Sequence, residues 1–430
     1  MIFSWLTHPM VLPVSLPLAA GLFCLLIPTR AFRLRAGFTV LTTAAVLYLA
    51  WQLFGMNGQS FDPGLFGGRW LEFRVDALSG LTVLACAFFA FLIAVFSTGF
   101  YARDSGAEPV GGRDAAASSH FYTWFLWTLG LACAVALSND LLFLLVCWGA
   151  LGLLLYLLVS TAGPGAARAA RKSLLIIGAT DALLLFGVVL YWQLTGSTQL
   201  SGDGMGGVGL QLGGWVSWTA LLAFLCAAFA KAGVMPFHSW VPDFGESADA
   251  PVSAYLPASL DKLLGIYLLA RCAIDLFELT PGVYLALMAI GAITIIGAVL
   301  MALVQHDLKR LLSWHAVSQV GYMVLGIGTG TPVGMAGGLF HMLNNTLYKS
   351  ALFLGAGVID REVGSSNLDR LGGLSRLLPF TFIAMAIAAL AISGIPPLNG
   401  FASKWMIYQL SLIHISEPTR QDTRSRMPSD

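Results

Sequence analysis

The sequence predicts an all-α polytopic membrane protein with about twelve transmembrane helices. Hydrophobic residues make up 57% of the 430-residue chain and charged residues only 10%. Apolar runs of about 20 residues, long enough to cross the hydrocarbon core of a bilayer, recur from one end to the other. The net charge is +1, and no basic patch interleaved with aromatic residues points to nucleic acid. The predicted surroundings are therefore a lipid bilayer and no nucleic acid.

The predicted spans follow the apolar runs in order, separated by polar connections that hold nearly every arginine. The first run has no basic flank before it and no small-residue cleavage site after it, so we predict a retained span and not a removed signal. The twelve predicted spans lie near residues 10–28, 36–55, 76–98, 121–138, 140–161, 173–193, 215–235, 253–275, 282–303, 309–328, 334–358 and 379–411.

The distribution of basic residues predicts the orientation. When connections are counted alternately from the N-terminus, one side holds little beyond Arg69, Arg74 and Arg271. Because cytoplasmic connections carry excess lysine and arginine, we predict an N-terminus outside a bacterial inner membrane. We expect Arg271, near a span end, to extend its side chain to the headgroups. The rich side holds Arg30, Arg33, Arg35, Arg103, Arg113, Arg168, Arg171, Lys172, Lys309, Arg310, Arg361, Arg370 and Arg376.

Four of the six lysines, in contrast, lie inside or at the break of apolar runs: Lys231, Lys262, Lys349 and Lys404. A lysine inside a bilayer costs about 2.5–3.5 kcal/mol on insertion scales, so its repeated use predicts a transport pathway. A desolvated lysine can lose its proton, whereas an arginine effectively cannot. The pattern indicates proton or ion transport.

Two of the predicted spans are interrupted beside these lysines. In the seventh span Lys231 is followed by Gly233 and Pro236, and in the twelfth Gly394 and Pro397 precede Lys404. Proline removes a backbone donor, and irregular backbone at membrane depth survives only when it is buried in protein or lines a wet cavity. The shared Gly-aliphatic-x-Pro pattern is also what an inverted repeat would produce.

The cysteines give no sign of a metal or cofactor. They form no Cys-x-x-Cys pair and have no His-rich neighbour, so we interpret them as core residues. No glycine-rich nucleotide loop or haem ligand pair is found either, and redox chemistry would therefore reside in partner subunits. The six cysteines are Cys24, Cys86, Cys133, Cys147, Cys226 and Cys272.

Five ordered motifs carry a resemblance to a known family. They are KAGVMPFHSWVPD, APVSAYLPASLDKLLGIYLLAR, HDLKRLLSWHAVSQVGYM, HMLNNTLYKSALFLGAGVI and SGIPPLNGFASKW, and the similarity runs from about Asp76 to Lys404. The chain resembles the antiporter-like membrane subunits of respiratory complex I. That family includes the large subunits of Mrp sodium/proton antiporters, membrane subunits of group 4 hydrogenases and the membrane partner of certain inorganic-carbon uptake systems.

The resemblance implies a polar axis along the middle of the membrane. Matched to the family residue by residue, the implied proton pathway comprises Lys231, Lys262, Lys349, Lys404, His341 and Asp181. Three further residues, His238, His315 and Asp307, could serve the pathway. The alternative is that the two histidines are core residues and that Asp307 is a solvated anchor.

One position departs from the family pattern. Relatives commonly carry a glutamate directly after the fifth-span tryptophan, where it pairs with the seventh-span lysine, but here Trp148 is followed by Gly149. We expect Asp181 to be the nearest replacement for this acid.

The family also predicts two inverted repeats. We expect N-terminal flanking spans over 1–120, a first antiporter-like repeat over 121–275 and an incomplete second repeat over 282–411. The polar stretch 412–430 resembles translated adapter sequence, and we expect it to be non-native.

The predicted function is proton translocation, without a redox centre of its own, in a complex I-like NADH-quinone oxidoreductase or related hydrogenase, beside other membrane subunits. Two alternatives remain: a subunit of a cation/proton antiporter or inorganic-carbon uptake complex, and a non-conducting structural paralogue.

Overall fold

We describe the fold from a computed structural model, for residues 4–28, 31–64, 71–102, 115–200 and 209–416. Most of the predicted tail, 417–430, lies outside these residues, whereas 412–416 belong to the last helix. The α-helices are α1 Leu12–Leu26, α2 Phe32–Gln52, α3 Ala77–Ala102, α4 Ala115–Leu137, α5 Leu141–Ser160, α6 Ala167–Thr195, α7 Trp215–Ala232, α8 Trp240–Ser247, α9 Ala250–Tyr255, α10 Asp261–Arg271, α11 Pro281–Leu303, α12 Leu308–Gly328, α13 Pro332–Val363, α14 Leu374–Leu377, α15 Pro379–Ser393 and α16 Asn399–Ser416.

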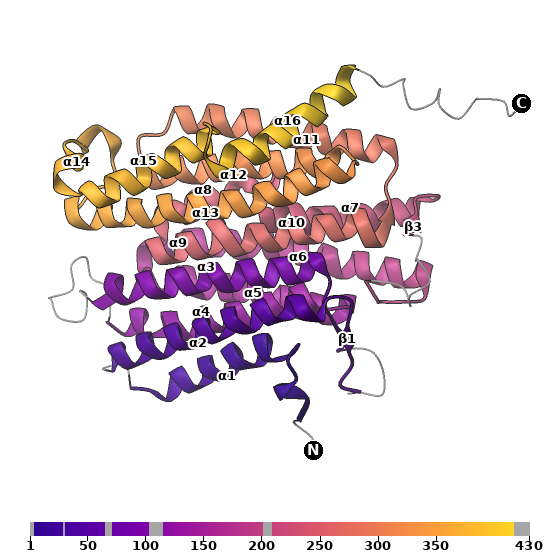
Figure 1. The fold of residues 1–430 in the computed structure, drawn as a ribbon, viewed down its shortest axis with the longest axis horizontal. Coiled ribbons are helices and arrows are strands. Elements are labelled where there is room, and N and C mark those ends of the chain that lie inside the picture. Colours follow the sequence, from indigo (N-terminus) through magenta and orange to yellow (C-terminus); the bar gives the residue numbers. More distant parts are fainter. Residues whose placement is uncertain (1–3, 29–30, 65–70, 103–114, 201–208, 417–430) are drawn as a thin grey trace, which may run out of the picture.

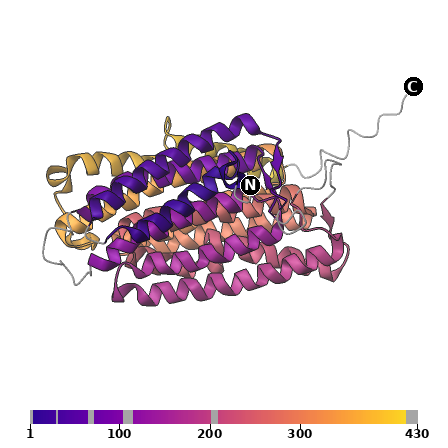
Figure 2. The same cartoon turned by 90° about the horizontal axis from the view of Figure 1, so that it is seen from below.

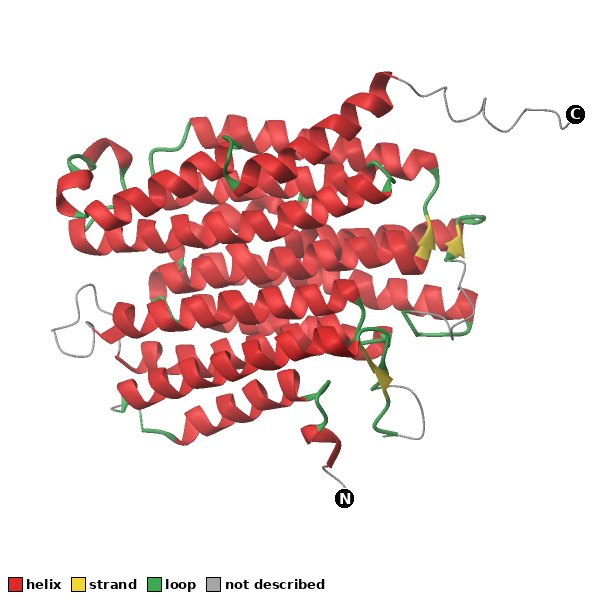
Figure 3. Ribbon diagram, in the orientation of Figure 1, coloured by secondary structure: helices red, strands yellow, loops and turns green. Residues whose placement is uncertain are grey.

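Short elements complete the chain. The 3₁₀ turns are η1 Ser4–Thr7, η2 Leu53–Met56, η4 Pro164–Ala166, η5 Phe237–Ser239 and η8 Leu368–Arg370, and two π-helical segments, η6 Leu256–Leu260 and η7 Cys272–Leu276, flank α10. Strands β1 Ser60–Phe61 and β2 Phe73–Arg74 pair antiparallel, and β3 Leu210–Gln211 and β4 Phe277–Glu278 pair parallel. Both small sheets lie at the same end of the bundle (Figure 3).

The long helices run side by side along one direction, as two perpendicular views show (Figures 1 and 2). Each of the twelve predicted spans coincides with helix. By length and composition, seven helices of the described chain could cross a membrane: Phe32–Met56, Ala77–Ala102, His120–Leu137, Leu141–Ser160, Ala167–Thr195, Trp215–Ser247 and Pro281–Leu303. The structure therefore confirms an all-helical membrane protein.

The predicted spans outside this set differ from it for physical reasons. The first, α1, is short, at 15 residues. The eighth and twelfth are divided into shorter helical pieces, and α12 and α13 are long but rich in polar residues and glycine. Three of the four buried lysines lie on these less hydrophobic elements, which is consistent with helices that line a polar path instead of facing lipid.

Both predicted helix breaks are present. The helix α7 ends at Ala232, and Gly233 follows in the left-handed region with φ +82°. The helix α15 ends at Ser393, and Gly394 follows with φ +79°. A residue without a Cβ is favoured at such positions, so glycine ends each helix at the point where proline then prevents its continuation.

The helix α12 lies at the centre of the C-terminal half and touches α8, α11, α13 and α16. Its contact with α11 is close: a Cβ on Gly321 would lie 2.6 Å from the carbonyl oxygen of Gly291, and one on Gly291 would lie 2.8 Å from that of Gly321. Small residues at crossings let two membrane helices approach backbone to backbone. This packing brings the backbones of α11 and α12 into close contact beside the buried lysines.

Candidate functional site: a row of buried lysines

The four lysines identified in the apolar runs are buried, with relative exposures of 1% for Lys231 and Lys262, 0% for Lys349 and 8% for Lys404. Each ammonium donates a hydrogen bond to a backbone carbonyl of another helix. The pairs are Lys231 Nζ to Trp148 O at 3.3 Å, Lys262 Nζ to Ala316 O at 2.9 Å, Lys349 Nζ to Leu312 O at 2.9 Å and Lys404 Nζ to Ile392 O at 2.5 Å. Within the described residues, none of these lysines forms an ion pair.

At one end of the row, Trp148 connects Lys231 to Asp181. The Lys231 ammonium lies 4.8 Å from the centre of the Trp148 ring and donates to the Trp148 carbonyl. The indole Nε1–H donates to Asp181 Oδ1 at 2.8 Å. The amine and the half-buried carboxylate are thus joined through one tryptophan and do not touch. Sequence reasoning predicted Asp181 but not the bridging role of Trp148.

The position of the absent glutamate faces outward. A Cβ on Gly149 would meet no atom within 4 Å, and the residue lies on the exposed face of α5. A longer side chain would therefore fit sterically within this chain.

In the middle of the row, two lysines share α12. Lys262 comes from α10 and Lys349 from α13, and their acceptors, Ala316 and Leu312, are one helical turn apart on α12. His315 lies between these acceptors in sequence, and its Nδ1 is buried without a hydrogen-bond partner in the described structure. The structure thus brings His315 to the lysine row.

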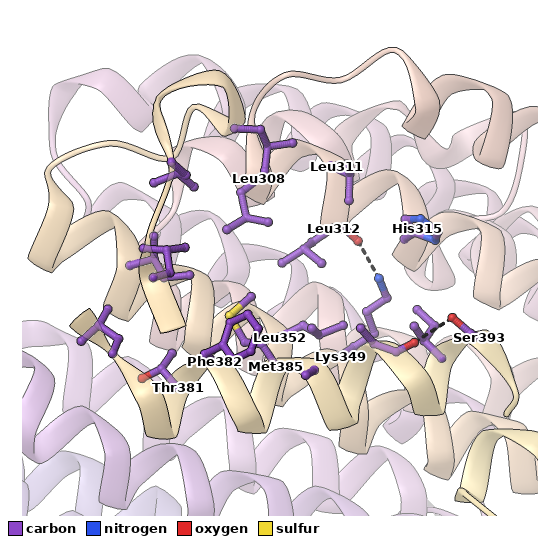
Figure 4. Close-up of a pocket in the computed structure, with 18 residues that line it drawn as sticks. Leu308, Leu311, Leu312, His315, Lys349, Leu352, Thr381, Phe382, Met385 and Ser393 are labelled. Atoms are coloured by element: carbon purple, nitrogen blue, oxygen red, sulfur yellow. Dashed lines mark hydrogen bonds between the residues drawn. The ribbon is translucent and has the colours of Figure 1, made fainter. Parts of the chain in front are cut away.

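A crevice of about 530 Å³ reaches Lys349 and His315 (Figure 4). It runs between α12 and α15, from Leu308 at the start of α12 to Ser393 at the end of α15. Figure 4 shows the Lys349 side chain extending to the Leu312 carbonyl while Thr381, Phe382 and Met385 line the crevice from α15. The crevice therefore reaches the middle of the row at Lys349.

At the other end of the row, Lys404 and His341 meet around Tyr322. The Lys404 ammonium lies 4.9 Å from the centre of the Tyr322 ring, and the centres of the Tyr322 and His341 rings are 5.5 Å apart. His341 Nδ1 and Ser403 Oγ are 3.0 Å apart, whereas His341 Nε2 has no partner in the described structure. Asn345, one turn further along α13, is fully buried, and neither its amide oxygen nor its amide nitrogen has a partner there. This end of the row therefore holds several buried polar atoms beside Lys404.

The two remaining candidates lie apart from the row. His238 is in η5, within the break between α7 and α8, and the centre of its ring lies 5.3 Å from the centre of the Trp314 ring. Asp307 caps α12 by accepting from the Arg310 amide at 2.9 Å. The Asp307 geometry is that of a helix N-cap.

Sequence reasoning missed one acid in the core. Asp261, 3% exposed, opens α10 next to Lys262, and its Oδ2 has no hydrogen-bond partner among the described residues. Its carboxylate interacts electrostatically with both Lys231 and Lys262. The signal was available, because the acid stands in the same apolar run as Lys262.

Arg271 does not extend to headgroups, and the expectation that it would is wrong. Its guanidinium is 7% exposed and bonds to two carboxylates, Asp76 at 2.7 Å and Asp275 at 2.8 Å, while its Nε donates to Tyr267 at 3.0 Å. Burial alone would raise the pKa of Asp76, which precedes α3, but Arg271 lowers it below its usual value. Carboxylates from two elements hold this arginine inside the bundle in preference to the lipid interface.

The helix arrangement around this row is the fold of a complex I membrane subunit. A chain of respiratory complex I from Thermus thermophilus superposes with a TM-score of 0.80 at 26% identity, covering 95% of this chain and 83% of that one. Residues 138–414 match the NADH:quinone oxidoreductase/Mrp antiporter transmembrane family, and the chain belongs to that family. The family predicted from the motifs is confirmed.

Two curated relatives show the breadth of the family. Hydrogenase-4 component B of Escherichia coli K12 is 33% identical over 363 residues, which cover 80% of this chain and 52% of the relative. NADH-quinone oxidoreductase subunit L of Mycobacterium tuberculosis is 33% identical over 352 residues, which cover 80% of this chain and 53% of the relative. The chain thus spans about half the length of these relatives. The chain is thus similar to antiporter-like membrane subunits of hydrogenase and quinone oxidoreductase complexes.

Proposed function

We propose that this chain translocates protons as a membrane subunit of a complex I-like quinone oxidoreductase or a related hydrogenase, and that electron flow in partner subunits drives it. The observation that carries the proposal is the row of four buried lysines held by backbone carbonyls. A buried cation without an ion-pair partner costs stability, so its fourfold presence is best explained by function. The chain's relatives in hydrogenase and quinone oxidoreductase assemblies support a redox-driven partner.

In this proposal the pathway comprises Lys231, Lys262, Lys349, Lys404, His341 and Asp181, joined by His315 at the crevice. A lysine can transfer a proton where an arginine cannot, because only the ammonium can become neutral in a protein interior. The breaks at Gly233 and Gly394, which share one backbone conformation, are what two related halves over 121–275 and 282–411 would contain.

The proposed orientation places the N-terminus outside. Charged residues at one end of the bundle support it: Lys309 pairs with Asp360 at 2.5 Å, Arg310 with Glu246 at 2.7 Å and Lys172 with Asp243 at 2.6 Å. Under the positive-inside rule this end is cytoplasmic, and α1 begins at the opposite end.

The test is Lys231→Ala in native membrane vesicles that contain the assembled complex. We expect substrate-driven proton uptake, followed with a pH-sensitive dye, to fall about a hundredfold or more, as loss of a positioned proton-transfer group does. Electron transfer to an artificial acceptor should remain. Lys172→Ala, which removes a lysine outside the row, is the matched control and should retain proton uptake.

Unchanged proton uptake by assembled Lys231→Ala would refute the proposal and favour a non-conducting paralogue. The same vesicles assayed with and without sodium separate the cation/proton antiporter alternative, in which proton movement should require the second cation.

A further inference from the structure

The strongest unassigned feature of the core is the dipeptide Asp261–Lys262. It begins α10 directly after the π-helical segment η6, Leu256–Leu260. Single π-helical turns within α-helices frequently mark functional sites, because the extra residue turns the following side chains toward a new face. Here the side chains so placed are an acid and an amine, 3% and 1% exposed.

The two side chains point to different helices. Gly265, one turn after Asp261, packs against α7: a Cβ there would lie 2.5 Å from the Ala232 amide nitrogen and 2.8 Å from the Ala228 carbonyl oxygen. Residues four apart share a helix face, so Asp261 also faces α7, beside Lys231. Lys262, the next residue, donates instead to α12.

Two acids act electrostatically on the lysines Lys231 and Lys262. Asp181 interacts with Lys231 alone, whereas Asp261 interacts with both lysines. Asp181 is already bound by the Trp148 indole, whereas Asp261 Oδ2 has no hydrogen-bond partner in the described structure. A buried carboxylate with a free oxygen needs a nearby positive charge.

We propose that Asp261 is the counter-charge shared by Lys231 and Lys262. This inference rests on the proposed function and assigns a positioning role within the same path. Asp261 is a negative charge that holds one lysine charged at a time, and it neither accepts nor releases a proton in this role. No oxidant or reductant takes part.

The transport experiment compares Asp261→Asn, Asp261→Glu and, as a matched control, Asp243→Asn, whose carboxylate pairs with Lys172 outside the row. In vesicles with the assembled complex, we expect Asp261→Asn to lower proton uptake about tenfold or more. Asp261→Glu should restore most of it, and Asp243→Asn should leave it unchanged. Full proton uptake by Asp261→Asn, where Lys231→Ala is inactive, would overturn the inference.

A second measurement does not depend on transport. A double-mutant cycle on the purified protein measures the melting temperatures of Asp261→Asn, Lys262→Met and the double variant. If the two residues share a charge interaction, the double variant should lose less in melting temperature than the sum of the two single losses. Additive shifts would overturn the counter-charge. If Asp261→Asn fails to accumulate, its recovery in the double variant supports the inference and failure of both refutes it. The thermal cycle could show an interaction between Asp261 and Lys262 while Lys231→Ala keeps full proton uptake. That combination would show that the proposed function is wrong and that the charge pairing is right.

Discussion

Replacing Lys349 by methionine should remove transport and yet preserve or raise stability. Lys349 is fully buried on α13, and its ammonium has one hydrogen bond, to Leu312 O at 2.9 Å. The charged lysines that act on it electrostatically are Lys262 and Lys404, both cations. Among the described residues, no acid would lose a partner if Lys349 were removed, in contrast to Lys231 and Lys262, which interact with Asp261.

The magnitude follows from two opposing terms. A lysine at membrane depth costs about 2.5–3.5 kcal/mol, and a hydrogen bond from a charged donor returns about 1.5–3 kcal/mol. Methionine has a similar length and no charge, so Lys349→Met should be neutral or stabilising by up to about 2 kcal/mol, with relief of like-charge repulsion acting in the same direction.

The assay is thermal melting of purified protein in detergent, with proton uptake measured in parallel. The control is Lys172→Met, because Lys172 is part exposed, pairs with Asp243 at 2.6 Å and donates to Ser239 O at 2.7 Å. That variant should lose about 0.2–1 kcal/mol. If Lys349→Met melts below Lys172→Met, the Lys349 ammonium is a structural link between α12 and α13, and the reasoning fails.

Three further outcomes are expected. Asp76→Asn should lower the free energy of unfolding by about 1–3 kcal/mol, because Arg271 loses one of its two carboxylate partners. The folded pKa of Asp76 lies below its ordinary 3.8, so the stability difference from wild type should be complete above that pH and should vanish on further acidification. Thermal melts over a series of pH values measure this difference. Gly321→Ala should lower the free energy of unfolding by about 1–3 kcal/mol, because the added Cβ would lie 2.6 Å from a carbonyl oxygen of α11. Gly149→Ala, whose Cβ would meet no atom, should raise it by about 0.5–1 kcal/mol. Denaturant titration of the two variants measures both changes. His341→Leu should lower proton uptake and cost about 0.5–1.5 kcal/mol in a thermal melt, because Nδ1 loses its hydrogen bond with Ser403 Oγ whereas Nε2 has no partner to lose in the described structure.

The helices and their breaks were predictable because the signals are local. Runs of apolar residues set the span positions, and glycine followed by proline ended α7 and α15 where expected. The burial of the four lysines was predictable for the same reason, since each stands within or beside such a run.

The partners of these lysines were not predictable from the sequence. Every acceptor is a backbone carbonyl, which all residues possess, so no side-chain pattern could identify Trp148 or Leu312 as acceptors. The burial of Arg271 depended on two carboxylates, one of them nearly 200 residues away in sequence, that only the tertiary fold brings to it.

The helix α12 explains how lysines with different surroundings form one row. Lys231 and Lys262 have acids near them, whereas Lys349 and Lys404 are accompanied in the described structure by histidines and unpartnered amide atoms. Lys262 and Lys349 donate to carbonyls one turn apart on α12, and α12 packs closely against α11 through mutual glycine contacts. Under the proposed function, a proton that moves between Lys262 and Lys349 would therefore pass along this face of α12, beside His315.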